Sequence, residues 1–247
     1  MKAVSLQIVL TQFVGAVCAA VLAAAEVGPG AAGKSGRVTA DLAGTVSVVG
    51  KYGPPKPLPV FKNRDFCGPS VPNETLLVDA AGGLRNAVVT LRALDRKAST
   101  QPGMAVLDNV NCAFAPHVQV ATVGSELLLK NSDPILHAVH ARLGKETLFN
   151  VGLPTWRRVV KRLDRVGVVR IDCDVLHTWM SAAVVVVDTP YFAVSDAAGR
   201  FAIENLPAGD YVMEVWHERL GSRRERLRFG ADGSARVEIV YSMESAR

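Results

Sequence analysis

The chain contains little histidine and cysteine, few aromatic residues and almost no sign of helix. Its 247 residues include five histidines, four cysteines and 6% aromatic residues. Outside the N-terminal segment, an apolar pattern with the helical period is hard to find. The best helical candidate, Thr155–Leu163, is short and contains consecutive arginines. These shortages argue against all-helical and α/β proteins, and they leave few possible ligands for a metal ion.

The positive charge is modest and is concentrated in two runs. The formal net charge is +5. Aromatic residues do not interleave with the basic ones as in a surface that stacks nucleic-acid bases, so nucleic acid is not an expected partner. Such runs are usually solvated faces, but they can also attract an acidic redox partner or anionic lipid headgroups. The runs are Arg157, Arg158, Lys161, Arg162 and Arg165, and Arg219, Arg223, Arg224, Arg226 and Arg228.

The N-terminus has the layout of a secretory signal peptide. Met1 and Lys2 form a short positive start, residues 4–22 are mostly apolar, and Ala23–Ala25 offers a cleavage site of the A-x-A type. An uncleaved membrane anchor is the alternative, because the apolar run is long for a signal. We expect residues 1–25 to be removed and residues 26–36 to form a flexible lead-in. The mature protein would then be periplasmic or secreted, without a stable membrane span.

Export makes the number of cysteines informative. Cleavage would remove Cys18 and leave Cys67, Cys112 and Cys173, an odd number. In an oxidising compartment Cys67 and Cys112 are the natural disulfide pair, and Cys173 then remains a free thiol. In the alternative, Cys173 belongs to the disulfide and one of the other two cysteines is free.

Short strands separated by glycine, aspartate and proline turns predict an all-β fold. Many short strands at regular spacing are typical of β-sandwiches. Residues 183–187 are almost purely β-branched and predict a buried strand. The other predicted strands are residues 37–49, 76–79, 87–94, 118–123, 126–130, 191–194, 200–203, 211–216 and 236–241.

The segment Ile171–Met180 places three kinds of metal ligand within eight residues. It contains the thiol of Cys173, the imidazole of His177 and the thioether of Met180. A mononuclear blue-copper site takes such a set from one loop and a second imidazole from elsewhere. His137 fits that need, because it follows a predicted strand and a turn. The alternative is a core cysteine with two ordinary histidines.

At these residues the sequence resembles the cupredoxin family. The pattern Asn131-x-Asp133-x-x-x-His137 is similar to the family's first ligand segment, and Cys173-x-x-x-His177-x-x-Met180 is similar to its C-terminal ligand loop. The resemblance covers residues 118–187 and implies a type 1 site for one copper ion. The implied ligands are His137, Cys173 and His177 as a trigonal set, with Met180 as the long axial ligand.

Two positions distinguish this chain from related copper sites. The binuclear centre of cytochrome oxidase subunit II has a second cysteine at the position of His177, so a binuclear site is not expected here. Cupredoxins usually have asparagine directly after the first histidine, where its side chain ties the two ligand loops together. This chain has Ala138 instead. We therefore expect a looser set of groups around the ligands, and such groups set ligand orientation and redox potential.

The C-terminal part resembles the carboxypeptidase regulatory-like, transthyretin-like β-sandwich. The resemblance rests on residues 194–211, which read VSDAAGRFAIENLPAGDY. Residues 44–46 and 86–91 could supply the first strands of that sandwich, so a cupredoxin-like Greek-key sandwich at 96–188 is predicted to be inserted between 37–95 and 189–247. The outer sandwich would be transthyretin-like or immunoglobulin-like. This combination also resembles exported bacterial proteins described as plastocyanin-like or methylamine-utilisation-like.

Other polar residues near the predicted ligands are assigned supporting roles. These residues are Asn131, Asp133, His140 and Trp179. His140 would lie on the opposite face of an extended segment from His137, which favours a supporting role over metal binding. Trp179 is expected to pack over the site and exclude water. The last two histidines, His117 and His217, are predicted to be structural.

The ligand set on an all-β pattern predicts an exported copper protein that carries single electrons. Catalysis is not expected, because a copper oxidase or nitrite reductase needs an additional catalytic copper and the remaining histidines are scattered in the sequence. A binding or scaffold module with an incidental metal is an alternative of a different class. Copper delivery or storage is a further alternative, since it would use the same ligands.

Overall fold

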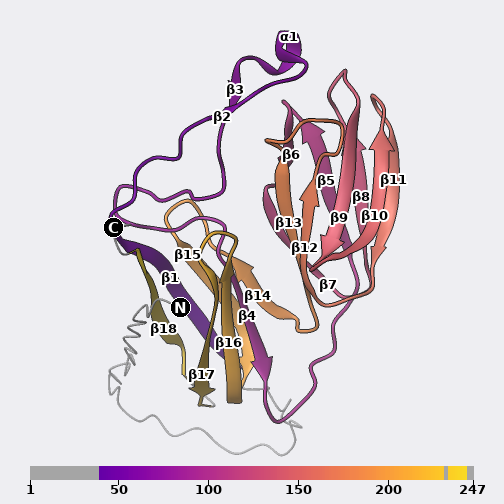
Figure 1. Ribbon diagram of the computed structural model, residues 1–247. Coiled ribbons are helices and arrows are strands. Elements are labelled where there is room, and N and C mark those ends of the chain that lie inside the picture. The colour runs from indigo at the N-terminus through magenta and orange to yellow at the C-terminus, as the bar shows by residue number, and fades with distance from the viewer. Residues whose placement is uncertain (1–38, 231–232, 244–247) are drawn as a thin grey trace, which may run out of the picture.

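The computed structural model of the chain contains two β-sandwiches that lie side by side (Figure 1). It describes residues 39–230 and 233–243. In these residues the structure has eighteen strands and one short helix. The all-β class predicted from the sequence is therefore confirmed.

The first sandwich packs a three-stranded sheet against a four-stranded sheet. Its strands are β1 (Thr39–Gly50), β4 (Val88–Ala93), β14 (Tyr191–Val194), β15 (Arg200–Pro207), β16 (Gly209–His217), β17 (Gly221–Phe229) and β18 (Ala235–Met243). The sheet orders are β15-β1-β18 and β14-β4-β16-β17. Buried and exposed residues alternate along much of β15 and β18, which turns one face of each strand toward a shared core.

The second sandwich packs a five-stranded sheet against a four-stranded sheet. Its strands are β5 (Met104–Val110), β6 (Ala113–Ala115), β7 (Val118–Thr122), β8 (Ser125–Asn131), β9 (His137–Leu143), β10 (Glu146–Leu153), β11 (Arg158–Leu163), β12 (Gly167–Asp172) and β13 (Ser181–Val187). The sheet orders are β10-β9-β12-β13-β7 and β11-β8-β5-β6. A separate core, which includes Leu107, Leu127 and Val169, lies between them.

The second sandwich interrupts the first along the chain. Strands β4 and β14 pair antiparallel in the first sandwich, and all strands of the second sandwich lie between them in sequence. The transthyretin-like assignment of the outer sandwich and the domain boundaries at residues 95 and 188 stay predictions.

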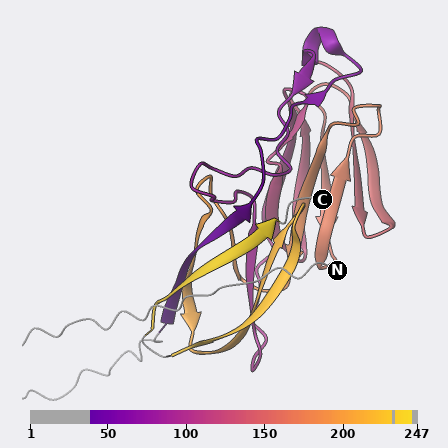
Figure 2. The same ribbon diagram turned by 60° about the vertical axis from the view of Figure 1, so that its left-hand side comes forward.

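A hairpin reaches from the first sandwich to one end of the second (Figures 1 and 2). It consists of β2 (Leu58–Pro59), the helix α1 (Arg64–Cys67) and β3 (Ser70–Val71), and β2 pairs with β3. We call residues 58–71 the strap. The predicted disulfide between Cys67 and Cys112 is confirmed, and it joins α1 to the turn between β5 and β6. The strap is therefore anchored covalently to the second sandwich.

The predicted helix at Thr155–Leu163 is wrong. Its second half is strand β11, which pairs antiparallel with β8. Exposure alternates from Arg158 to Leu163 with a period of two, because every second side chain faces the sheet's packed side. The predicted strand at residues 76–79 is also absent, apart from a single bridge between Val78 and Leu84. Strand β17 escaped prediction because arginines occupy its exposed face.

A polar contact joins the two sandwiches next to a small apolar cluster. The cluster includes Val88 and Trp216 from the first sandwich and Val185 from the second. The ring of His117 in the second sandwich hydrogen-bonds to the carboxylate of Glu218 in the first. Burial alone would lower the pKa of His117, but the bond and charge of Glu218 outweigh burial and raise the pKa. This histidine is therefore protonated and paired more readily than in water.

We expect His217 to make the protein less stable as the pH falls from about 6.5 to about 4. Burial lowers the pKa of His217 to about 4 from its ordinary 6.5. As the pH falls, His217 is therefore protonated in the unfolded chain before it is protonated in the folded one. Its contribution to the free energy of unfolding is fully present above pH 6.5 and is lost as the pH falls toward 4, by about 3 kcal/mol in total. Urea denaturation at several pH values gives the free energy of unfolding at each pH. Between pH 6.5 and 4 this free energy should fall less steeply for His217→Gln than for the wild type. An equal fall in both proteins would contradict the assignment.

The N-terminal predictions fall outside the part of the chain that the structure describes. The predicted signal peptide (1–25) and lead-in (26–36) precede residue 39. Within 39–230 and 233–243, no helix is long and apolar enough to cross a membrane. Export, signal cleavage and a periplasmic or secreted location stay predictions.

Candidate metal centre

Two neighbouring strands bring the predicted ligands to one end of the second sandwich. His137 is the first residue of β9, and Cys173 directly follows the last residue of β12. The two strands pair antiparallel, with Asp172 opposite His140. In an antiparallel pair the start of one strand lies beside the end of the other. Residues that are 36 positions apart in the sequence therefore meet, and His177 joins them from the loop between β12 and β13.

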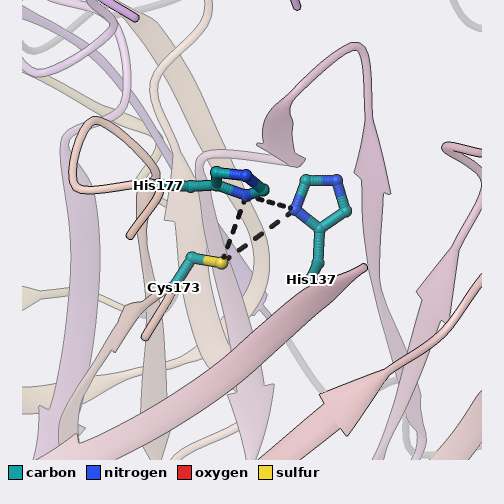
Figure 3. A group of neighbouring side chains, drawn as sticks. All are labelled: His137, Cys173 and His177. Carbon is teal, nitrogen blue, oxygen red and sulfur yellow. Dashed lines mark hydrogen bonds between the residues drawn. The ribbon is translucent and has the colours of Figure 1, made fainter. Parts of the chain in front are cut away.

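The side chains of His137, Cys173 and His177 form one buried cluster (Figure 3). The Sγ atom of Cys173 lies 4.0 Å from Nδ1 of His137 and 3.7 Å from Nδ1 of His177, and the two nitrogens are 3.1 Å apart. The exposed fractions of the three residues are 0%, 5% and 0%. One sulfur and two nitrogens thus face the same small volume, away from water.

Asp133 orients the ring of His137. Its Oδ2 lies 2.9 Å from Nε2 of His137 and also accepts the backbone N–H of Cys112, while its Oδ1 accepts that of Asn111. An ionised carboxylate can only accept, so Nε2 of His137 carries the hydrogen. The lone pair of Nδ1 then points at the other two donor atoms.

Asn63, on the strap, orients the ring of His177 in the same way. Its Oδ1 lies 2.8 Å from Nε2 of His177, and an amide oxygen also only accepts. His177 therefore presents the lone pair of its Nδ1 as well. Sequence reasoning missed Asn63, since the residue precedes the ligand loop by more than a hundred positions and belongs to no ligand motif.

Burial and backbone contacts determine the protonation of the cluster in the metal-free protein. Burial raises the pKa of the Cys173 thiol, although the backbone N–H of Ala138, 3.3 Å from Sγ, opposes the rise. Burial lowers the pKa of His137 and lowers that of His177 to about 4, where the nearby charge of His137 also contributes. At neutral pH both imidazoles are neutral and able to bind a metal. The thiol would lose its proton when a metal binds.

The donor set fits a metal ion of the size of copper or zinc. Nitrogen and sulfur ligands lie about 2.0–2.3 Å from such ions, so ligands of one ion are about 3–4 Å from each other. The observed separations of 3.1, 3.7 and 4.0 Å agree. With the hydrogens of both rings on Nε2, the two Nδ1 lone pairs face each other at 3.1 Å, and a bound cation would remove this repulsion.

The other predicted site residues lie around this cluster. Met180 is buried and its backbone N–H donates to the carbonyl of His177; the axial role of its thioether stays a prediction. Trp179 packs against the His177 ring, with 5.0 Å between ring centroids, and donates its indole N–H to the carbonyl of Cys112. His140 faces away from the cluster toward Asp174 and Thr147.

Asn131 stabilises the turn that leads to His137. Its amide group donates to the carbonyls of Ile135 and Leu153, and its Oδ1 accepts the backbone N–H of Asp133. The side chain is buried, so these bonds are shielded from water. Asn131 thus holds Asp133, and through it the first histidine, in place. Its contact with the cluster is indirect.

Comparison with known proteins gives partial structural likenesses only. No family model and no curated protein matches the chain. A purple cupredoxin from Nitrosopumilus maritimus matches with 23% identity over 34% of this chain and 99% of its own, at a TM-score of 0.31. The reduced state of an amicyanin mutant matches with 18% identity over 40% and 99%, also at 0.31. The copper-containing nitrite reductase of Thermus scotoductus SA-01 matches with 18% identity over 39% of this chain and 25% of its own, at a TM-score of 0.32. We draw no functional conclusion from likenesses with such low TM-scores.

Proposed function

We propose that this protein is an exported type 1 copper protein of the cupredoxin kind that carries single electrons. One copper ion would be held by His137, Cys173 and His177, with Met180 as the axial ligand. The observation that carries the proposal is the convergence of two imidazole lone pairs and one thiol on a single buried point. A thiolate with two imidazoles and a weak thioether is the donor set of blue-copper sites.

The surroundings of the cluster favour electron transfer over catalysis. Bound copper would supply one-electron chemistry by changing between its Cu(I) and Cu(II) states. The three ligand side chains are at most 5% exposed, and Trp179 covers one of them. A catalytic metal keeps an open position for substrate, whereas burial leaves no such access here. Each histidine is also held by a hydrogen bond to its second nitrogen, which limits its movement during a change of charge.

The two basic runs give weak support for an acidic redox partner. Arg162 and Arg165 in the first run, and Arg224 and Arg228 in the second, already form ion pairs with acidic residues of this chain. Their charge is therefore partly neutralised, and the attraction of a partner would be screened further at physiological salt. We keep an acidic redox protein as the proposed partner and assign these pairs no role in its selection.

Titration of the metal-free protein with Cu(II) tests the function. We expect an intense visible band from the thiolate–copper bond that saturates at one equivalent, and an EPR signal of a single copper species. The melting temperature should rise, because a ligand that binds only the folded state at 100 times its Kd stabilises by about 2.7 kcal/mol. The band should disappear on reduction and return on oxidation with copper retained.

Three outcomes of this titration would contradict the proposed function. Absence of the band would exclude a type 1 site. Stability that is the same with and without copper would favour a binding or scaffold module with an incidental metal. Loss of copper to a chelator on reduction, without recovery of the band on oxidation, would indicate delivery or storage. A parallel titration with Zn²⁺, which also accepts cysteine and histidine ligands, shows whether the site discriminates between the two ions.

A further inference from the structure

Besides the disulfide that anchors it, the strap makes two hydrogen bonds to the loop that contains Cys173 and His177. Nζ of Lys62 donates to the carbonyl of Val175 in the ligand loop, at 3.2 Å. Oδ1 of Asn63 accepts from Nε2 of His177, at 2.8 Å. The strap lies at the ligand end of the second sandwich in both views (Figures 1 and 2). A segment more than a hundred residues upstream therefore lies against the loop that supplies Cys173 and His177.

The side chain of Asn63 does not cap the helix that begins after it. The residue is the N-cap of α1, where an asparagine oxygen normally accepts a backbone N–H of the first helical turn. Here the side chain makes no such capping bond, and its oxygen contacts His177 instead. The backbone of Asn63 is left-handed, with φ 55° and ψ 37°, a conformation that asparagine tolerates better than most residues. The residue thus gives up a capping bond in favour of the histidine.

The anchor of the strap is tied to the same centre. Cys112, the disulfide partner of Cys67, is fully buried. Its N–H donates to Asp133, which orients His137, and its carbonyl accepts from Trp179, which packs on His177. The residue that holds the strap is therefore in hydrogen-bond contact with groups that support both histidines.

We propose that the strap forms one side of the metal centre and that Asn63 is the positioning residue for His177. Its amide oxygen keeps the hydrogen of His177 on Nε2 and leaves Nδ1 free to bind the metal. Without this acceptor, the hydrogen can move to Nδ1, where it would block binding. The role of Asn63 toward a metal rests on the function proposed above; its role in the tautomer of His177 does not.

The test uses Asn63→Gly, Asn63→Asp and Asn205→Gly. Glycine removes the acceptor yet accepts the left-handed backbone without strain, so the variant should fold. Aspartate retains an acceptor oxygen and serves as the rescue. Asn205 is the matched control, because it is an exposed asparagine with φ 59° in the first sandwich.

The first readout is the tautomer of His177 in the metal-free protein, measured by ¹⁵N NMR of the imidazole nitrogens. We expect the Nε2–H form alone in the wild type, Asn63→Asp and Asn205→Gly, and a mixture with the Nδ1–H form in Asn63→Gly. The second readout is the rate of Cu(II) release to a chelator. Loss of an outer hydrogen bond to a ligand typically costs about 10–100-fold in affinity, so release should be faster by about that factor in Asn63→Gly only.

The two readouts separate the positioning role from the copper function. An unchanged tautomer in Asn63→Gly, or copper release equal to that of Asn205→Gly, overturns the role of Asn63 while the copper function stands. A wild type that takes up no copper overturns the function, and the NMR comparison then decides the role of Asn63 without any metal.

Discussion

Replacement of Cys173 by serine is expected to abolish the intense visible band of the copper-loaded protein. Only a thiolate gives this charge-transfer band, and the other cysteines that the structure describes are joined in a disulfide. A serine hydroxyl does not ionise near neutral pH and is a poor ligand for copper in this donor set. Affinity for Cu(II) should fall by more than about 100-fold, since even outer groups contribute about 10–100-fold.

A pair of histidine variants provides the control for Cys173→Ser. His137→Gln removes a proposed ligand, whereas His140→Gln changes the same strand on its other face, where the side chain contacts Asp174 and Thr147. We expect loss or strong change of the band for His137→Gln and an unchanged band for His140→Gln. A band that survives Cys173→Ser would place the copper elsewhere in the protein.

The free energy of unfolding of the double variant Cys67→Ser/Cys112→Ser is expected to be about 4 kcal/mol lower than that of the wild type. The disulfide joins residues 45 positions apart, and a closed loop of that length restricts the unfolded chain by about this amount in the chain-entropy model. Urea denaturation followed by circular dichroism measures the difference. Copper should also leave the variant faster, because the strap that carries Asn63 loses its covalent anchor.

A reducing agent provides the control for the disulfide prediction. A dithiol that opens the disulfide should destabilise the wild type to the level of the double variant and leave the double variant unchanged. A loss of less than about 1 kcal/mol in the variant would contradict the prediction, and it would mean that non-covalent contacts hold the strap without the disulfide.

Local sequence patterns accounted for nine of the eighteen strands that the structure describes, and for the proposed ligands in the loop after β12. Alternating or β-branched runs predict strands because side chains on an extended backbone point to opposite faces in turn. The pattern was misleading at Thr155–Leu163, where consecutive arginines hid a period of two in what became strand β11. Strand β17 was hidden by its arginines for the same reason.

The identity of the proposed ligands was readable from the sequence, since Cys173, His177 and Met180 share one short loop. Their separation along the backbone limits how far apart they can lie, whatever the rest of the fold does. The partner histidine needed an added argument, namely the order of strand, turn and His137. Its position beside Cys173 depends on the antiparallel pairing of β9 with β12.

The orientation of the proposed ligand side chains could not be predicted from the sequence, and only the folded structure shows it. The oxygen that fixes the tautomer of His177 belongs to Asn63, 114 positions away, and Asp133 is held by the backbone of Cys112. Such contacts depend on how distant segments pack and leave no periodic or spaced pattern in a sequence. The amino-acid order thus specifies which donor atoms exist and in what order they occur, while tertiary packing decides which lone pairs face one another.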